Sequence, residues 1–149
     1  MKIKYTSIGR HMLIIDKYFK LFLKNSLKKY GLNAAEGLVL LSLYGQEGRT
    51  QEQIVNELHY DKSVMTRIMQ SLEKKDYVLR QKNSADSRSY IFLLTDKAKK
   101  FKLIFTDILK EWSDLVLEGV DESMLNLADE VLASILKNVR KKVEGKNEE

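Results

Sequence analysis

The chain has 149 residues, 44% of them hydrophobic and 32% charged, which fits one folded domain and excludes an extended disordered chain. It contains no cysteine, which excludes disulfides, thiol redox sensing and cysteine-based metal sites, and its two histidines are too few for a histidine cage. The formal net charge is +5 and is unevenly distributed, because residues 1–95 hold 16 Lys and Arg against 9 Asp and Glu, whereas residues 96–149 hold 10 against 12.

The basic part of the chain has two interpretations. A basic surface attracts polyanions such as nucleic acids by releasing counterions. The same residues also fit an ordinary solvated lysine-rich face. No run of about 18 apolar residues is present, which excludes a membrane-spanning helix. The N-terminal segment lacks the apolar stretch of a signal peptide, so we expect an unprocessed, cytoplasmic protein.

A long amphipathic helix is predicted over residues 8–30. Apolar residues recur there at steps of three and four, which places them on one stripe of a helix. Gly31 then supplies a C-terminal stop. The stripe comprises Ile8, Met12, Ile15, Phe19, Phe22, Leu23, Leu27 and Tyr30.

Two short helices follow, and each is introduced by a capping box. Asn33–Glu36 precedes the strongly apolar segment 38–44, which we expect in the centre of the core. Thr50–Gln53 opens the second helix in the same way. A third helix is predicted over residues 62–75, with Asp61 as its cap.

The third helix has one apolar and one polar face. Val64, Ile68 and Leu72 fall at steps of four and are predicted to form its buried seam. Two short helices joined by a tight turn, the second with a polar outer face, are typical of a helix-turn-helix. The turn, residues 59–61, contains no glycine, which is unusual for such a motif.

A β-hairpin and two more helices complete the predicted order. β-branched and aromatic residues in 77–82 and 89–94 flank the polar turn 83–87. Thr95 caps a long helix, a last helix follows, and the charged tail 141–149 is expected to fray. The apolar stripes of the two helices are Phe101, Ile104, Phe105, Ile108, Leu109, Trp112, Leu115 and Val116, then Met124, Ala128, Val131, Leu132, Ile135, Leu136 and Val139.

Two motifs resemble a known family. Asp86-x-Arg88, followed by Leu94 and Thr95, resembles the wing signature of the MarR family of winged helix-turn-helix regulators. The run Leu72–Val78 resembles the exit from that family's recognition helix. The resemblance covers essentially the whole chain, including the terminal helices.

Two positions depart from the family pattern. Asp76 and Ala98 stand where the family commonly has glycine. Aspartate tolerates the left-handed backbone better than most residues, so the turn after the recognition helix can be kept. The alanine is expected to alter packing at the start of its helix. Neither departure touches the residues expected to face DNA.

The resemblance implies a mainly helical fold with a small β-hairpin wing and dimerisation helices at both ends. It implies a single domain, 1–149, in which 1–31 and 96–149 form the helical dimerisation region and 32–95 the winged helix-turn-helix region. It further implies a homodimeric repressor that binds an inverted repeat in double-stranded DNA and is often controlled by a small-molecule effector. We expect no cofactor, no metal and no membrane association.

The predicted DNA contacts come from the polar face of the third helix, from helix starts and from the wing. Arg pairs well with guanine and Gln with adenine, and free N–H groups at a helix start bind phosphate. By resemblance, Arg88 enters a narrow minor groove and Asp86 holds it in place. Solvated helix faces, caps and a surface ion pair remain the plainer alternatives. The set is Thr50, Gln51, Lys62, Ser63, Thr66, Arg67, Gln70, Arg80, Lys82, Asp86 and Arg88.

Two other classes of function are alternatives to DNA binding. One is a helical protein-interaction module with an inert wing, which DNA-binding assays on the wild type and variants would distinguish. The other is an enzyme, but the sequence shows no glycine-rich phosphate loop, nucleophile elbow or metal-spaced His/Glu set, so we expect no catalysis. An effector pocket is predicted from Met12, Ile15, Tyr44 and Tyr60.

Overall fold

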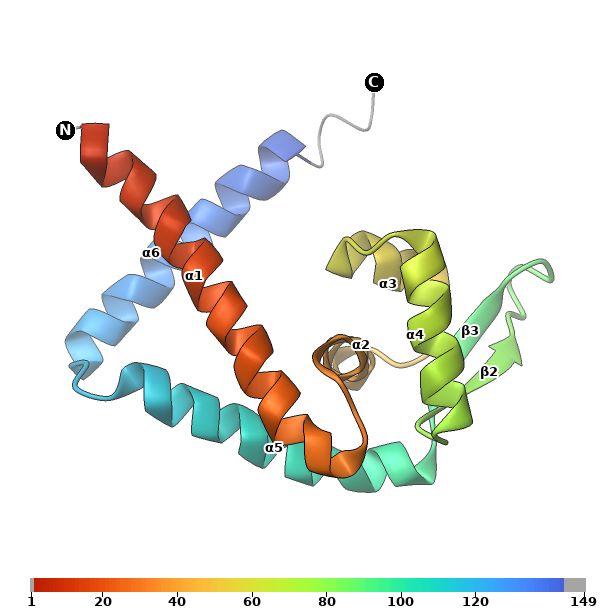
Figure 1. Cartoon of the computed structure of the whole chain (residues 1–149). Coiled ribbons are helices and arrows are strands. Elements are labelled where there is room, and N and C mark those ends of the chain that lie inside the picture. Colours follow the sequence, from red (N-terminus) through yellow and green to blue (C-terminus); the bar gives the residue numbers. More distant parts are fainter. Residues whose placement is uncertain (1, 144–149) are drawn as a thin grey trace. The chain divides into compact units, whose positions relative to one another are not determined.

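The structure, a computed structural model, describes residues 2–143, with side chains from residue 7 onward (Figure 1). The predicted order of elements is confirmed, with a short strand added and with the last turn of the first predicted helix, Lys28–Tyr30, formed as a 3-10 helix. The elements are α1 (Lys2–Leu27), η1 (Lys28–Tyr30), α2 (Ala34–Gly45), β1 (Arg49–Thr50), α3 (Gln51–Leu58), α4 (Lys62–Lys74), β2 (Val78–Lys82), β3 (Tyr90–Leu94), α5 (Asp96–Leu117) and α6 (Glu122–Val143). The predicted fraying of the tail lies, from residue 144 onward, outside the described residues.

The chain forms two compact units. The first, Met1–Trp112, holds α1 through most of α5, and the second, Ser113–Glu149, holds the end of α5 and α6. The boundary therefore lies inside a helix. The predicted division into a dimerisation region and a DNA-binding region concerns function, so it stays a prediction. None of the helices described between residues 2 and 143 is both long and apolar enough to cross a membrane.

The core of the first unit is built around α2, as its apolar sequence predicts. Val39, Leu40 and Leu43 are each at most 1% exposed. α1 packs against this helix, and a Cβ added to Gly37 would run into the buried side chain of Leu27. Glycine at this position therefore lets the two helices approach closely.

Both predicted capping boxes are present. Asn33 Oδ1 accepts a hydrogen bond from the Glu36 N–H at 2.9 Å, and the Glu36 carboxylate accepts from the Asn33 N–H at 2.8 Å. Thr50 and Gln53 make the equivalent pair at the start of α3. The third predicted cap is wrong in one respect, because Asp61 occupies the N-cap of α4 but its side chain makes no capping hydrogen bond.

The buried seam of α4 also differs from the prediction. Met65, Ile68, Met69 and Leu72 are between 0% and 7% exposed, whereas Val64 is 38% exposed. Steps of four drift around a helix of about 3.6 residues per turn, and alternating steps of three and four stay on one side. The assignment of Val64 to the seam was therefore wrong.

The predicted hairpin is confirmed as part of a three-stranded antiparallel sheet with strand order β1-β3-β2. In the hairpin, Val78 of β2 lies opposite Leu94 of β3. The added strand, β1, has only two residues, and its Arg49 lies opposite Phe92. A strand this short shows no alternation of polar and apolar residues, so periodicity could not reveal it.

The predicted cap of α5 is confirmed, because Thr95 Oγ1 accepts from the Ala98 N–H at 3.1 Å. Ala98 is fully buried, and its carbonyl accepts from the Tyr44 hydroxyl at 2.8 Å. Three more residues of α5, Phe101, Phe105 and Ile108, are buried. This helix is thus held in the core of the first unit along its N-terminal part.

Two apolar stripes lie on the outside of the chain. In α1, Leu23 and Leu27 are fully buried, but Ile8 and Ile15 near its N-terminal end are 46% and 56% exposed. In α6, no residue between Glu122 and Val143 is buried. The large apolar residues of α6 that are exposed are Met124, Leu127, Val131, Leu132, Leu136, Val139 and Val143.

Candidate nucleic-acid interface

The pair α3 and α4 has the geometry of the predicted helix-turn-helix. His59 takes the left-handed conformation that the turn requires, with φ of 54°, and its N–H donates to the Val55 carbonyl at 2.8 Å. A histidine thus does what glycine usually does in such a turn. Asp76 has φ of 60°, which confirms that aspartate carries the left-handed turn after α4.

The outer face of α4 is polar and open to solvent. The apolar seam of α4 packs on the core, so the side chains of the opposite face are exposed and can reach a ligand. Guanidinium and amide groups on such a face match the donors and acceptors at the edges of base pairs. The predicted residues on this face are all exposed: Lys62, Ser63, Thr66, Arg67 and Gln70.

Two of the predicted DNA contacts bind each other. The Gln51 side-chain amide donates to Thr66 Oγ1 at 2.8 Å and to the Lys62 carbonyl at 3.5 Å, and the Thr66 hydroxyl donates to the Lys62 carbonyl at 2.9 Å. Gln51 therefore links the start of α3 to the start of α4. Thr50 is likewise engaged as the cap of α3, accepting from the Gln53 N–H at 3.3 Å.

The wing tip is the loop of residues 83–89. Hydrogen bonds from backbone N–H groups to side-chain oxygens hold this loop. Asn83 Oδ1 accepts from the Ala85 N–H, and Asp86 Oδ1 accepts from the Arg88 N–H, both at 3.0 Å. The spacing of Asp86 and Arg88 would place both side chains on the same side of a strand, but both residues lie in the loop between β2 and β3. The Asp86 carboxylate thus bonds to the backbone of Arg88, whose side chain is exposed. The role of Asp86 in positioning Arg88 on DNA stays a prediction.

A groove joins the wing to the helix-turn-helix. It has a volume of about 380 Å³ and is lined from both sides by residues predicted to contact DNA, together with neighbours the sequence did not single out. Its basic side chains are Arg80 and Arg88, and its acidic ones are Glu52 and Asp86. The lining residues are Thr50, Gln51, Glu52, Arg80, Asn83, Asp86, Arg88, Ser89, Tyr90 and Phe92.

Arg80 is held in place on the sheet surface. Its guanidinium lies 4.5 Å from the centre of the Tyr90 ring, and its Nε lies 3.9 Å from a carboxylate oxygen of Glu73. Stacking on an aromatic ring orients a guanidinium without using all its donors. Lys82, two residues further along β2, is exposed, and strand alternation places both cations on one side of the strand.

A buried carboxylate anchors the C-terminal end of α4. Glu36 is 1% exposed and accepts from Lys75 Nζ at 2.7 and 2.8 Å and from the Ser71 hydroxyl at 2.6 Å. Burial alone would raise the pKa of Glu36, but the hydrogen bonds from Lys75, Ser71 and the Asn33 N–H outweigh it and lower the pKa. Lys75 is thus a structural partner of Glu36, and the capping box at Asn33–Glu36 did not reveal this pair.

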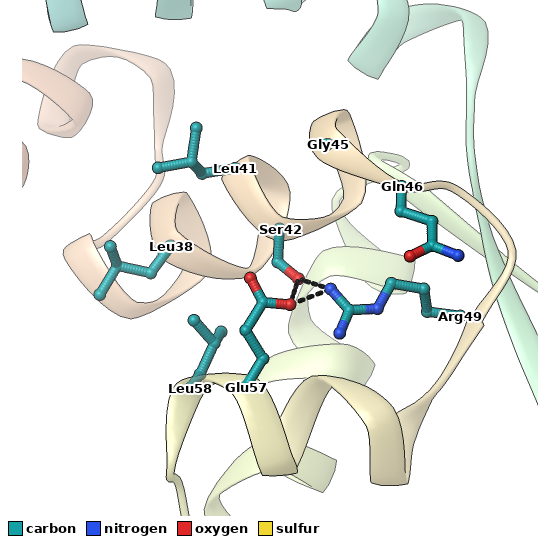
Figure 2. A pocket seen from close by; sticks show the side chains of 8 residues that line it. All are labelled: Leu38, Leu41, Ser42, Gly45, Gln46, Arg49, Glu57 and Leu58. Carbon is teal, nitrogen blue, oxygen red and sulfur yellow. Dashed lines mark hydrogen bonds and ion pairs between the residues drawn. The ribbon is translucent and has the colours of Figure 1, made fainter. Parts of the chain in front are cut away.

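The predicted effector residues are spread over the first unit. Tyr44 and Tyr60 are half-buried, whereas Met12 and Ile15 are exposed. The Tyr44 hydroxyl donates to the Ala98 carbonyl, and burial raises the pKa of Tyr44. A cavity of about 400 Å³ lies between α2, β1 and α3, and none of these four predicted residues lines it (Figure 2). The effector pocket stays a prediction.

Comparisons with known proteins agree with this geometry. The sequence profile of the MarR family matches residues 30–89. The HTH-type transcriptional regulator SarZ of Staphylococcus epidermidis is 28% identical over 131 residues, which cover 88% of this chain and 84% of SarZ. A MarR transcriptional regulator from Methanosarcina mazei Go1 has 27% identity and a TM-score of 0.88, over 93% of this chain and 99% of that structure.

The similar structures include complexes with DNA. A MarR family transcriptional regulator from Listeria monocytogenes, solved in complex with 26mer DNA, has a TM-score of 0.80 over 89% of both chains. At 19% sequence identity, this similarity concerns the fold. The winged helix-turn-helix described above is therefore an arrangement found in proteins of this family.

Proposed function

The chain belongs to the MarR family of transcriptional regulators, and on this premise we propose that it binds an inverted repeat in double-stranded DNA as a homodimer. One observation carries the proposal. The groove beside the wing tip is lined by Arg80 and Arg88 and by Gln51 at the start of α3, and the Gln51 amide donates to Thr66 on the exposed polar face of α4. A helix and a wing arranged in this way can contact two adjacent grooves of one duplex.

Each part of the surface has its own role in the proposal. Arg67 and Gln70 contact base edges in the major groove, where a guanidinium or an amide can make two hydrogen bonds to one base. Arg88 enters the minor groove, whose negative potential is enhanced where it is narrow. Arg80 and Lys82 neutralise phosphates and fix the orientation of the protein on the duplex.

The dimer follows from the exposed apolar stripes. Large apolar patches on a soluble protein mark sites of association, and the stripes of α1 and α6 lie at opposite ends of the sequence. A two-fold dimer carries one α4 per chain, which matches an inverted repeat with half-sites about one helical turn apart.

The test is selection of binding sites from random duplexes with the purified protein. We expect an inverted repeat and an affinity that falls steeply with salt. Arg67→Ala is expected to lower affinity by about 1–3 kcal/mol and to relax preference at one or two base pairs. Wild-type affinity in both Arg67→Ala and Arg88→Ala, with normal thermal melts, would contradict the proposal.

The proposal extends to repression under control of a small molecule. Such an effector must bind the conformation that is free of DNA more tightly, because equal affinity for both states shifts nothing. Since the chain has no cysteine, its own thiol oxidation cannot be the switch. The test is release of bound DNA by a panel of aromatic acids, and reversible release by peroxide would contradict it. The proposal includes a cytoplasmic location and no catalytic activity.

A further inference from the structure

A cluster of polar side chains beside β1 connects the three-stranded sheet, called the wing sheet below, to the helices α2 and α3. Figure 2 shows Arg49 of β1 reaching into the cavity between α2 and α3, where its guanidinium meets Ser42 and Glu57. Arg49 Nη1 donates to Ser42 Oγ at 2.7 Å and to the Glu57 carboxylate, and Nη2 donates to the Gln53 carbonyl at 3.1 Å. The Ser42 hydroxyl donates to Glu57 Oε2 at 3.0 Å. One side chain from β1 is thus bonded to α2 and α3 at once.

This cluster lies on the opposite side of β1 from the DNA-facing groove. Side chains of successive strand residues point to opposite faces. Arg49 lines the cavity between α2 and α3, and the next residue, Thr50, lines the groove beside the wing. The Arg49 side chain is only 14% exposed and its charge is matched by Glu57. Arg49 is therefore withdrawn from any phosphate while it keeps these partners.

β1 is the direct covalent link between the wing sheet and α3. It pairs with β3 at two positions only, and the Gly48 N–H adds one hydrogen bond to the Phe92 carbonyl at 3.0 Å. So short a strand contributes few sheet bonds to hold it in place. Since α3 begins at the residue after β1, the angle between wing and helices depends on how firmly β1 is held.

We propose that Arg49, Ser42 and Glu57 are positioning residues that set the distance between the wing tip and the base-contacting face of α4. The inference rests on the proposed DNA-binding function and adds residues that do not belong to the DNA-facing surface. When the cluster is broken, Arg67 stays in place on α4, but the wing shifts and Arg88 no longer reaches its groove. The affinity for DNA then falls through Arg88.

The first experiment is a double-mutant cycle between Arg49→Met and Arg88→Ala on the selected DNA site. Methionine keeps the apolar stem of arginine and removes the guanidinium. We expect Arg49→Met to lower affinity by about fivefold to fiftyfold in the wild-type chain, and by less than about twofold in Arg88→Ala, where the wing contact is already lost. Equal losses in both backgrounds would overturn the proposal.

Salt dependence in the Arg88→Ala background separates positioning from contact. A lysine or arginine that neutralises a phosphate contributes about one to the slope of log affinity against log salt. We expect Arg49→Met to leave the slope of Arg88→Ala unchanged, because Arg49 touches no phosphate. A slope reduced by about one would identify Arg49 as a direct phosphate contact and overturn the proposal.

A pair of matched charge variants on α3 tests the cluster without removing Arg49. By charge alone, loss of a carboxylate strengthens binding to a polyanion. Glu52→Gln, in the groove and outside the cluster, is therefore expected to tighten binding, whereas Glu57→Gln is expected to weaken it at the selected site. Equal tightening by both variants would overturn the proposal, and this holds even where Arg49→Met fails to fold. A wild-type chain that binds no duplex would instead contradict the proposed function.

Discussion

α4 and α6 are both amphipathic helices, yet only α4 buries its apolar stripe within its own chain. α4 buries Met65, Ile68, Met69 and Leu72, whereas α6 buries no residue between Glu122 and Val143. The two stripes have the same helical spacing in the sequence, so the difference lies in what surrounds them. An apolar stripe therefore predicts burial without saying whether the covering surface belongs to the same chain or to a second copy.

The same contrast separates the two tasks of the proposed regulator. In the proposed function, α4 uses its apolar face for folding and its polar face for DNA. α6 exposes its apolar face, which is then available for dimerisation. A change in the stripe of α4 should therefore damage the fold of each chain, and the same change in α6 should damage the association of two chains.

The largest effect is expected for Leu72→Ala in α4. It should lower the free energy of unfolding by about 2–5 kcal/mol, because it leaves a cavity in a filled core. Its counterpart, Leu132→Ala in α6, removes a side chain that is 51% exposed in one chain. The loss caused by Leu132→Ala should shrink when dilution separates the chains. Urea unfolding at two protein concentrations measures both losses. A loss in Leu132→Ala that does not depend on concentration would show that Leu132 does not act through association of two chains.

Val131→Glu in α6 should dissociate the dimer. Burial of such a side chain contributes about 1.5–3 kcal/mol, and a symmetric dimer loses two of them. Asn126→Glu adds the same charge on the opposite side of α6 and serves as the control. Light scattering at micromolar concentration should give a monomer mass for Val131→Glu and a dimer mass for Asn126→Glu. Equal masses for the two variants would contradict the assignment of the stripe to dimerisation.

Glu36→Gln tests the buried carboxylate that anchors the C-terminal end of α4. No such anchor is described for α6. Because the pKa of Glu36 is lowered from its ordinary value of 4.5, its stabilisation is present above that pH and is lost as the pH falls through the folded-state pKa. Glu36→Gln should cost about 1–3 kcal/mol near pH 7, since a buried hydrogen-bonded charge is lost. Unfolding measured between about pH 3 and pH 7 should show a weaker acid dependence in the variant. Parallel pH profiles would contradict this role.

The smallest effect is expected for Asp86→Ala in the wing. Asp86 acts through the Arg88 N–H, so its loss should cost less than about 1 kcal/mol of DNA-binding free energy and less than Arg88→Ala. Both variants should lose discrimination between A·T-rich and G·C-rich flanks. Ser87→Ala, on the exposed residue between them, is the control. A larger loss in Asp86→Ala than in Arg88→Ala, with normal thermal melts, would show that Asp86 does more than hold the loop.

Local patterns in the sequence predicted most of the fold. The capping boxes, the hairpin and the helix-turn-helix depend on residues close together along the chain, so spacing and residue type are sufficient to find them. The seam of α4 was misjudged at Val64 because steps of four alone do not follow the helix. The strand Arg49–Thr50 was missed because two residues carry no periodicity.

The sequence predicted which side chains of the candidate site are exposed, but it did not predict the hydrogen bonds between them. The exposed face of α4 follows from which positions are apolar. The bonds from Gln51 to Thr66 and from Lys75 to Glu36 join residues 15 and 39 apart, so they appear only once the helices are packed. Arg49 shows the same limit, since its position in the sequence does not tell whether it faces DNA or the cavity between α2 and α3.

A symmetric dimer that binds DNA through α4 and the wing can be examined by the stoichiometry and affinity of its binding to the selected site and to a variant of that site. The variant carries an insertion of about five base pairs at its centre, which turns one half-site to the opposite side of the duplex. We expect two chains on the selected site and a steep loss of affinity after the insertion. One chain per duplex, or equal affinity for the two sites, would contradict this expectation.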